Sequence, residues 1–132
     1  MELIANNKYL KNEELYNYDF FTNTCPTITY KKEKDTLYTT LIIDKDAPSK
    51  ETSNNRYYIH LFKINNDEII LNYEPPRPPK NSGEHRYYVY ILKQKNYYKY
   101  NNNNRKQFDY NDFFTKYNLT IAYEMCFKAI HK

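Results

Sequence analysis

The chain has 132 residues, a formal net charge of +4 and a mean hydropathy of −1.02. So low a hydropathy alone would indicate disorder, but disordered segments contain few aromatic residues, and this chain has 17 tyrosines and 7 phenylalanines. The charge permits an anionic partner, yet the sequence has no dense lysine or arginine block of the kind that binds nucleic acid. We therefore expect one folded domain, residues 1–132, with an aromatic core and no nucleic-acid partner.

The two cysteines, Cys25 and Cys126, are far apart and have no metal-ligand spacing. They are typical of reduced thiols in a reducing compartment. The N-terminal residues do not resemble a signal peptide, and no apolar run approaches the length of a membrane span. From these observations we predict a cytoplasmic protein.

The first predicted strands are short. Residues 1–5 are compatible with a strand, and residues 11–18 with a polar turn or a weak helix. Residues 27–30 are rich in β-branched side chains, and a charged, hairpin-like loop at 31–35 follows them. Residues 36–43 are mostly apolar, which predicts a strand buried on both faces.

A second strong strand is predicted at 56–64, after a polar loop at 49–55. In a regular strand the side chains alternate, so even-numbered and odd-numbered residues lie on opposite faces. The two predicted sets are Tyr58, His60 and Phe62, and Tyr57, Ile59 and Leu61. After a turn at 65–67, a short strand at 68–72 leads into a proline-rich segment.

Residues 73–90 contain four of the six prolines and the only glycine, Gly83. Glycine is needed where φ must be positive or where another group must approach the backbone closely. Asn81-Ser82-Gly83 is a turn signal directly before an alternating run that begins at His85. We predict a stiff proline loop, a glycine turn and a third strong strand over 85–94.

The last third of the chain contains the one predicted helix. It follows a low-complexity loop over 95–107, to which the sequence assigns no role beyond connection. Asp109 fits a helix N-cap, and aromatic residues follow at the i, i+3, i+4 and i+7 positions of an amphipathic helix. These are Tyr110, Phe113, Phe114 and Tyr117. A final strand at 119–127 makes the fold class mainly β.

Three segments carry side chains suited to binding an anion: the strand end 44–48, His60 in mid-strand, and the turn 82–85. Each is weak alone, because a single histidine in an apolar strand is more often a core residue, and Asp-x-Asp before proline is often a plain turn. If the segments meet, the two imidazoles and the backbone N–H groups of the turn can donate to phosphoryl or carboxylate oxygens. Tyr58 and Tyr87 would then line the same cavity.

The order of these motifs resembles that of the phosphatidylethanolamine-binding proteins, a family that includes a Raf kinase inhibitor and plant flowering regulators. The family's Asp-Pro-Asp-Ala-Pro strand end corresponds to Asp44-Lys45-Asp46-Ala47-Pro48, and its pocket histidine to His60. Its Gly-Thr-Gly-x-His-Arg-Tyr motif corresponds to residues 81–87, after Tyr73 and the pair Pro78-Pro79.

The resemblance covers about residues 25–127, with some departures. Lys45 replaces a motif proline, Asn81 replaces a glycine, and Thr120-Ile121-Ala122 replaces the Pro-Val-Ala that is common in the family. The resemblance also implies a domain truncated at both ends relative to typical members, with the C-terminal helix beside the pocket absent or reduced to a few residues.

The resemblance implies a fold of antiparallel β-sheets with one short helix in the C-terminal half, long loops and a small anion pocket. It implies a monomeric binding protein rather than an enzyme, without cofactor or metal, for a phosphate or a phosphorylethanolamine-type or phosphotyrosine-like group. The implied partners are a kinase or a protease, with peripheral contact to membrane lipids. The implied ligand-binding residues are Asp44, Ala47, Pro48, Tyr58, His60, Pro78, Pro79, Ser82, Gly83, His85 and Tyr87. Arg86 should point away from the pocket and pair with a carboxylate, with Asp46 as the candidate.

Other interpretations stay open. A hydrolase could use Asp44, His60 and His85 as acid and base with Ser82 as nucleophile, although no nucleophile-elbow pattern surrounds Ser82. The same aspartate and histidines could form a facial metal triad. Residues 75–80 fit an SH3-ligand pattern. A serine protease inhibitor acting through a surface loop is the remaining alternative.

Overall fold

The computed structural model describes residues 1–49 and 57–132. Nearly all of the predicted loop at 49–55, and Arg56 at the predicted start of the second strong strand, lie outside the described residues. The strands are β1 (Glu2–Ala5), β2 (Lys8–Tyr9), β3 (Leu15–Asn17), β4 (Thr27–Thr29), β5 (Tyr38–Asp44), β6 (Tyr58–Ile64), β7 (Glu68–Leu71), β8 (His85–Lys93) and β9 (Thr120–Ile130). The helices are a 3₁₀-helix (Tyr18–Phe21) and α1 (Tyr110–Lys116).

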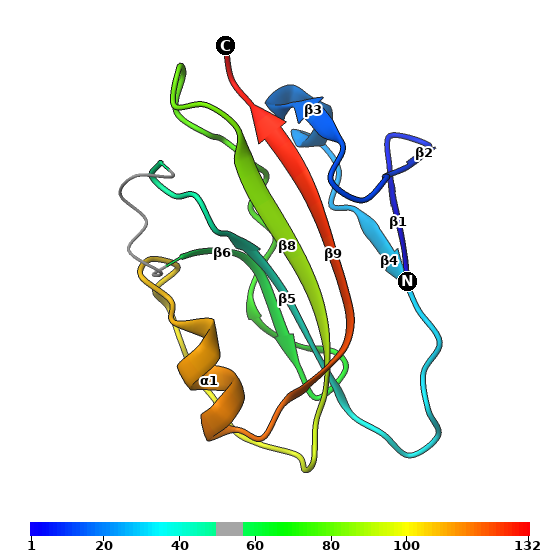
Figure 1. The fold of residues 1–132 in the computed structure, drawn as a ribbon. Coiled ribbons are helices and arrows are strands. Elements are labelled where there is room, and N and C mark those ends of the chain that lie inside the picture. Colours follow the sequence, from blue (N-terminus) through cyan, green and yellow to red (C-terminus); the bar gives the residue numbers. More distant parts are fainter. Residues whose placement is uncertain (50–56) are drawn as a thin grey trace.

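These strands form two sheets, as Figure 1 shows. The large sheet has six strands in the order β3-β9-β8-β5-β6-β7, and the small sheet has three in the order β2-β1-β4. Helix α1 and the small sheet lie on opposite sides of the large sheet. The predicted mainly β class is therefore confirmed, with one parallel pair, β3 with β9, among otherwise antiparallel strands.

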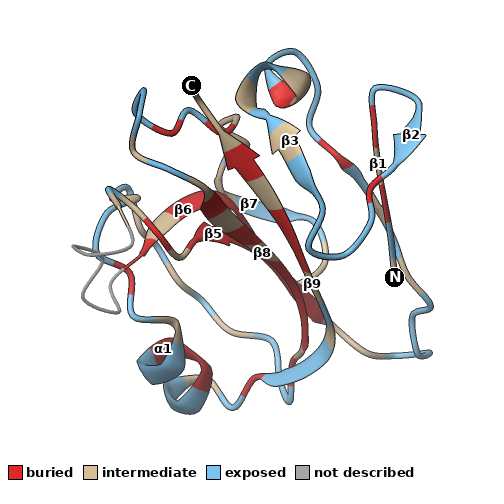
Figure 2. Cartoon of the chain, turned by 45° about the horizontal axis from the view of Figure 1, so that its top comes forward, coloured by how far each residue is buried: buried red, intermediate tan, exposed pale blue. Residues whose placement is uncertain are grey.

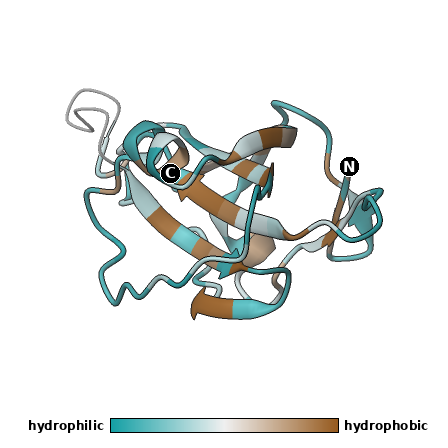
Figure 3. Cartoon of the chain, turned by 90° about the horizontal axis from the view of Figure 1, so that it is seen from below, coloured by the Kyte–Doolittle hydropathy of each residue, from teal (hydrophilic) through white to brown (hydrophobic). Residues whose placement is uncertain are grey.

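The central strand β5 matches its prediction closely. All seven of its residues are buried, and it pairs with β6 on one side and β8 on the other (Figure 2). An apolar run without alternation is what a strand covered on both faces requires. The hydropathy pattern in Figure 3 agrees, because apolar segments concentrate in the strands while the outer loops are polar.

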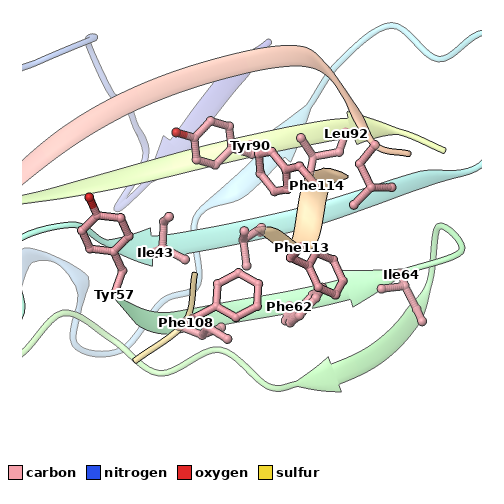
Figure 4. Packing of buried hydrophobic residues seen from close by; sticks show 12 residues of the cluster. Ile43, Tyr57, Phe62, Ile64, Tyr90, Leu92, Phe108, Phe113 and Phe114 are labelled. Atoms are coloured by element: carbon pink, nitrogen blue, oxygen red, sulfur yellow. The ribbon is translucent and has the colours of Figure 1, made fainter. Parts of the chain in front are cut away.

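Two cores cover the two faces of the large sheet. The helix-side core, seen in Figure 4, contains Leu41, Ile43, Tyr57, Ile59, Phe62, Ile64, Tyr90, Leu92, Phe108, Phe113, Phe114 and Leu119. The small-sheet core contains Leu3, Ala5, Leu10, Phe21, Ile42, Leu61, Tyr87, Val89, Phe127 and Ala129. Many of these side chains are aromatic, which is how a chain of low mean hydropathy buries enough apolar surface to fold.

Helix α1 forms as predicted. The Asp109 side chain caps it by accepting a hydrogen bond from the Asp112 N–H, with 3.1 Å between Oδ1 and N. Phe113 and Phe114 are buried in the helix-side core, and the Phe113 ring lies edge-on to Phe62 at 5.3 Å between centroids. The helix is therefore held by its aromatic face rather than by its own short length.

The N-terminal segment departs from the prediction. Residues 11–18 begin with a polar turn, in which the Glu14 N–H donates to the Lys11 carbonyl at 3.2 Å, but then form β3. Strand β3, which was not predicted, pairs in parallel with β9 near the other end of the chain. The loop at 31–35 closes no hairpin, since it joins β4 of the small sheet to β5 of the large sheet. Such short edge strands exist because a distant partner offers backbone groups, which leaves no mark on the local sequence.

Strand β6 breaks the predicted alternation at His60. Ile42 of β5 pairs with Leu61, but the next residue, Ile43, pairs with Ile59, so His60 is the extra residue of a β-bulge. As a result Ile59 and Phe62 both face the helix-side core. The predicted grouping of Phe62 with Tyr58 and His60 is therefore wrong, because a bulge reverses the faces beyond it.

The loop at 95–107 is more than a connection. Tyr98 and Tyr100 pack against the helix-side core, and the Ile59 N–H donates to the Arg105 carbonyl at 2.8 Å. The Arg105 guanidinium returns a hydrogen bond from Nη1 to the Ile59 carbonyl at 3.1 Å. These bonds hold the loop along the start of β6 and bring Lys106 and Gln107 to the cavity described below.

Candidate functional site

A cavity of about 610 Å³ lies where β5, β6 and β8 meet the proline loop and the loop at 95–107. Most of the predicted ligand-binding residues line it, namely Asp44, Ala47, Pro48, Tyr58, His60, Pro78, Pro79, His85 and Tyr87. The other two, Ser82 and Gly83, are not among its lining residues but lie in the turn that supports His85. The three segments singled out in the sequence therefore do meet.

Five further residues, which were not predicted from the sequence, also line the cavity. They are Tyr57, Glu74, Arg77, Lys106 and Gln107. Tyr57, Glu74 and Arg77 flank predicted residues, so proximity in sequence could have suggested them. Lys106 and Gln107 carry no such signal, because only the contact of their loop with β6 brings them near.

His85 is fully engaged by protein groups on both ring nitrogens. Nδ1 lies 2.7 Å from Asp44 Oδ2, and Nε2 lies 2.8 Å from Ser82 Oγ. Asp44 uses its second oxygen to accept the Asp46 N–H at 2.8 Å. Because the Asp44 carboxylate can only accept, Nδ1 carries a proton.

The order Asp44, His85, Ser82 is that of a catalytic triad, but the proton of Ser82 is directed elsewhere. Ser82 Oγ lies 2.6 Å from the Pro79 carbonyl oxygen, which can only accept, so the hydroxyl donates there. The Ser82 hydroxyl proton is therefore not directed at Nε2 of His85, although Oγ and Nε2 are 2.8 Å apart. A general base must accept the hydroxyl proton of Ser82, so this arrangement favours binding over acyl transfer.

His60 has a different role from His85. Its Nδ1 lies 2.6 Å from the Glu74 carbonyl oxygen, which requires a proton on Nδ1. Burial, as the largest cause, lowers the pKa of His60 from its ordinary value, so the ring is neutral at pH 7. A neutral ring with its proton on Nδ1 presents a lone pair at Nε2. The expectation that both imidazoles donate to an anion does not hold for His60 in this geometry.

The two tyrosines of the floor are also distinct. Tyr58 donates from its hydroxyl to Glu74 Oε1 at 2.7 Å, and burial together with this carboxylate raises the pKa of Tyr58 to about 12. Tyr87 is fully buried, stacked on Phe127 at 5.3 Å and edge-on to His60 at 5.1 Å. Its hydroxyl makes no hydrogen bond that meets ordinary geometry with any described residue, although burial and the nearby Asp44 carboxylate raise its pKa. A buried hydroxyl without a protein partner is a group that a ligand can satisfy.

Gly83 is needed for backbone conformation. Its φ is +87°, and a Cβ placed there would meet no atom within 4 Å. The turn is also held by Ser82 N–H to Pro79 O at 3.0 Å and by Asn81 N–H to His131 O at 2.9 Å. Positive φ therefore explains this glycine, whereas no other group occupies the space that a Cβ would take.

The proline loop is packed against the domain. Pro76 and Pro78 are buried, and the Glu74 N–H donates to the His60 carbonyl at 2.8 Å. An SH3 ligand must present its prolines to a partner groove, so this packing disfavours that interpretation. The prolines instead stiffen one wall of the cavity.

Three other features bear on the open interpretations. Within residues 1–49 and 57–132, no group of three or more His, Cys, Asp or Glu side chains is arranged to hold a metal ion. Cys25 is an exposed free thiol and Cys126 a buried one. No helix in the described part of the chain is both long and apolar enough to cross a membrane.

Comparison by sequence finds no matching family model and no matching curated protein. Comparison of structures shows that the fold is that of the phosphatidylethanolamine-binding proteins. A carboxypeptidase Y inhibitor, in complex with its cognate proteinase, matches with a TM-score of 0.84 and 18% identity over 99% of this chain and 82% of that one. The phosphatidylethanolamine-binding protein of Plasmodium vivax matches with a TM-score of 0.78 and 16% identity, over 99% of this chain and 85% of that one. The Plasmodium falciparum protein matches with a TM-score of 0.75 and 16% identity, over 97% and 83% of the two chains.

Proposed function

We propose that this protein is a non-catalytic binding protein whose cavity takes a phosphate or a phosphorylated small group. The observation that carries the proposal is the cavity itself, which joins a polar floor at His60, His85 and Tyr87 to a mouth with two cations. Cavities of several hundred Å³ with a few convergent polar groups are typical ligand sites.

The charges of the cavity favour an anion. Asp44 is paired with His85, and the Glu74 carboxylate is neutralised by Arg105, whose Nε lies 3.0 Å from Glu74 Oε2. Arg77 and Lys106 also line the cavity, and no ion pair among the described residues includes either of them. The surplus is therefore positive, and a phosphate group matches it in sign and in hydrogen-bonding capacity.

A test of this proposal is calorimetric titration of the protein with inorganic phosphate and with O-phosphorylethanolamine. Replacing the mouth cations, Arg77→Ser and Lys106→Ser, should weaken both ligands, and most strongly at low salt. Lys95→Ser is the matched control, because Lys95 is exposed and lines no part of this cavity. Absence of binding, or equal binding by the three variants, would contradict the proposal.

The structural neighbours suggest what such binding could regulate. One neighbour is a protease inhibitor and two are phosphatidylethanolamine-binding proteins, so a protease or another signalling protein is the proposed class of partner. A kinase partner, peripheral contact with membrane lipids, a monomeric state and a cytoplasmic location remain predictions from the sequence. Pull-down with immobilised carboxypeptidase Y is a direct test of a protease partner.

A further inference from the structure

The bulge in β6 places His60 at the floor of the cavity with a defined proton arrangement. Nδ1 donates to the Glu74 carbonyl oxygen at 2.6 Å, while Nε2 makes no hydrogen bond to any described residue. Since the ring lines the cavity, Nε2 is the nitrogen that a ligand can reach. That nitrogen offers a lone pair, so it accepts a hydrogen bond and cannot donate one.

The surroundings of His60 maintain this state near neutral pH. Asp44 from β5 and Glu74 from the proline loop both favour the imidazolium, whereas Arg105 from the loop at 95–107 opposes it. Tyr58 from β6 and Tyr87 from β8 pack against the ring at 5.1 Å each and are uncharged hydroxyls at neutral pH. Burial outweighs the two carboxylates, so the pKa of His60 is lowered overall.

Two requirements on a ligand follow from this geometry. The positive surplus from Arg77 and Lys106 calls for an anion. The lone pair at His60 Nε2 calls for a hydrogen-bond donor at the point of contact, because an unprotonated anionic oxygen there would face a second acceptor. An ammonium group would satisfy the second requirement but not the first.

One group of atoms meets both requirements: an oxyanion that still carries a proton. We propose that the cavity selects a phosphomonoester in its singly protonated form, whose P–OH donates to His60 Nε2, over phosphodiesters and sulfate. This inference rests on the proposed function and makes His60 the residue that sets specificity. The buried Tyr87 hydroxyl beside the ring makes no hydrogen bond of ordinary geometry, although the Asp44 carboxylate is near, and it can donate to another oxygen of the same phosphate.

The candidate ligands differ in whether they carry a proton on a phosphate or sulfate oxygen near neutral pH. A phosphomonoester has a second pKa near 6 and therefore carries its proton in part at neutral pH. A phosphodiester, as in an intact phospholipid head group, has no P–OH, and sulfate has none at this pH. The structure thus points to a small phosphomonoester rather than to a lipid diester.

The experiment compares ligands on the unaltered protein, so it does not depend on a variant that folds. O-phosphorylethanolamine and glycerophosphorylethanolamine carry the same ammonium and differ in the P–OH, and inorganic phosphate and sulfate form a second pair. At pH 6, where about half of a monoester carries the proton, we expect the member of each pair with a P–OH to bind about five- to tenfold more tightly, since one hydrogen bond of about 1.4 kcal/mol gives a factor of about ten. Equal affinity within both pairs would overturn the inference while leaving the proposed function intact. Binding by none of the four would overturn both.

Two measurements distinguish a proton that the ligand carries from one that His60 takes up: the pH dependence of the affinity and the ¹⁵N resonance of His60. The affinity for O-phosphorylethanolamine should rise as pH falls from 8 to 6.5, because the protonated monoester becomes more abundant, whereas inorganic phosphate carries a P–OH over this whole range. In the complex, the ¹⁵N resonance of His60 Nε2 should remain that of an unprotonated nitrogen that accepts a hydrogen bond. A protonated Nε2 in the phosphate complex would overturn the inference. His60→Gln, which can donate as well as accept, should bring the affinities for phosphate and sulfate closer together, and unchanged discrimination in that variant would also overturn it.

Discussion

Arg86 holds the buried carboxylate of Asp46 through two side-chain hydrogen bonds. Its Nε donates to Oδ2 and its Nη2 donates to Oδ1, both at 2.9 Å. The backbone N–H of Arg86 adds a third bond to Oδ2 at 2.8 Å. The pairing predicted from the sequence is confirmed. It ties the strand end after β5 to β8, next to the Asp44–His85 contact.

Removing this guanidinium should cost stability without changing the cavity. We expect Arg86→Met to lower the free energy of unfolding by about 2 kcal/mol, because the buried charge of Asp46 would lose both hydrogen bonds from the guanidinium. Urea denaturation measures the loss. The control is Lys93→Met, which breaks the exposed Lys93–Glu33 pair and should cost much less stability, because exposed ion pairs contribute little. A folded Arg86→Met protein with normal stability but no phosphate binding would contradict this role.

Lys45, which replaces a proline of the family motif, points its ammonium into a group of tyrosines. Nζ lies 3.8 Å from the centroid of the Tyr88 ring and 4.3 Å from that of Tyr110. It also donates to the hydroxyls of Tyr90 at 2.6 Å and Tyr110 at 3.1 Å. Because Tyr110 opens α1 and the other two lie on β8, Lys45 joins the helix to the sheet.

We expect Lys45→Met to destabilise the fold by about 1–2 kcal/mol, since cation–π attraction and two hydrogen bonds are lost while the apolar length is kept. Lys45→Arg should retain much of the stability, because a guanidinium also stacks on rings. Thermal unfolding of both variants measures this, with the exposed Lys95→Met as control. Equal melting temperatures for Lys45→Met and the control would refute the contribution of these rings.

His60 should make the protein sensitive to mild acid. Because the ring is buried, its pKa in the folded state is lower than the ordinary histidine value of 6.5. The unfolded chain therefore binds the proton more readily, and the free energy of unfolding should decrease as pH falls below about 6.5 and level off below the folded pKa. Urea titrations at pH 8, 6.5 and 5 measure the decrease. In His60→Gln this part of the decrease should disappear, and an identical pH profile in both proteins would be evidence against a neutral buried His60.

Ser82 distinguishes binding from hydrolysis. Since its proton is directed to Pro79 O, we expect Ser82→Ala to keep phosphate affinity, because His85 Nε2 then becomes available to the ligand. Calorimetric titration measures the affinity, and p-nitrophenyl esters report hydrolysis. Ester turnover by the natural protein that Ser82→Ala abolishes would favour the triad interpretation over the binding one.

A side chain at Gly83 should lower stability, although space for a Cβ is available. Gly83→Ala is expected to cost about 1 kcal/mol, because φ of +87° strains a residue with a Cβ. Gly83→Asn should cost less, since asparagine adopts positive φ more readily. Denaturant midpoints of the two variants test this, and an alanine variant as stable as the natural protein would contradict it.

Much of the fold could be predicted from local patterns. The apolar run of β5, the N-cap Asp109 with its aromatic face, and the alternating run from His85 each carry their structure in a short stretch. The candidate site could be predicted in part, because the segments around Asp44, His60 and His85 hold residue types suited to an anion. These features are local, so side-chain periodicity and capping are sufficient to reveal them.

Other features follow only from contacts between distant segments. The parallel pairing of β3 with β9, the bulge at His60, and the position of Lys106 beside the cavity depend on which backbone groups meet in space. The same holds for the protons on His60 and His85, because each is set by the partner of Nδ1, a carbonyl in one ring and a carboxylate in the other. The sequence by itself therefore determined the elements and the kinds of groups at the site. The tertiary structure alone decided which of those groups donate and which accept, since a hydrogen bond is defined by both of its partners.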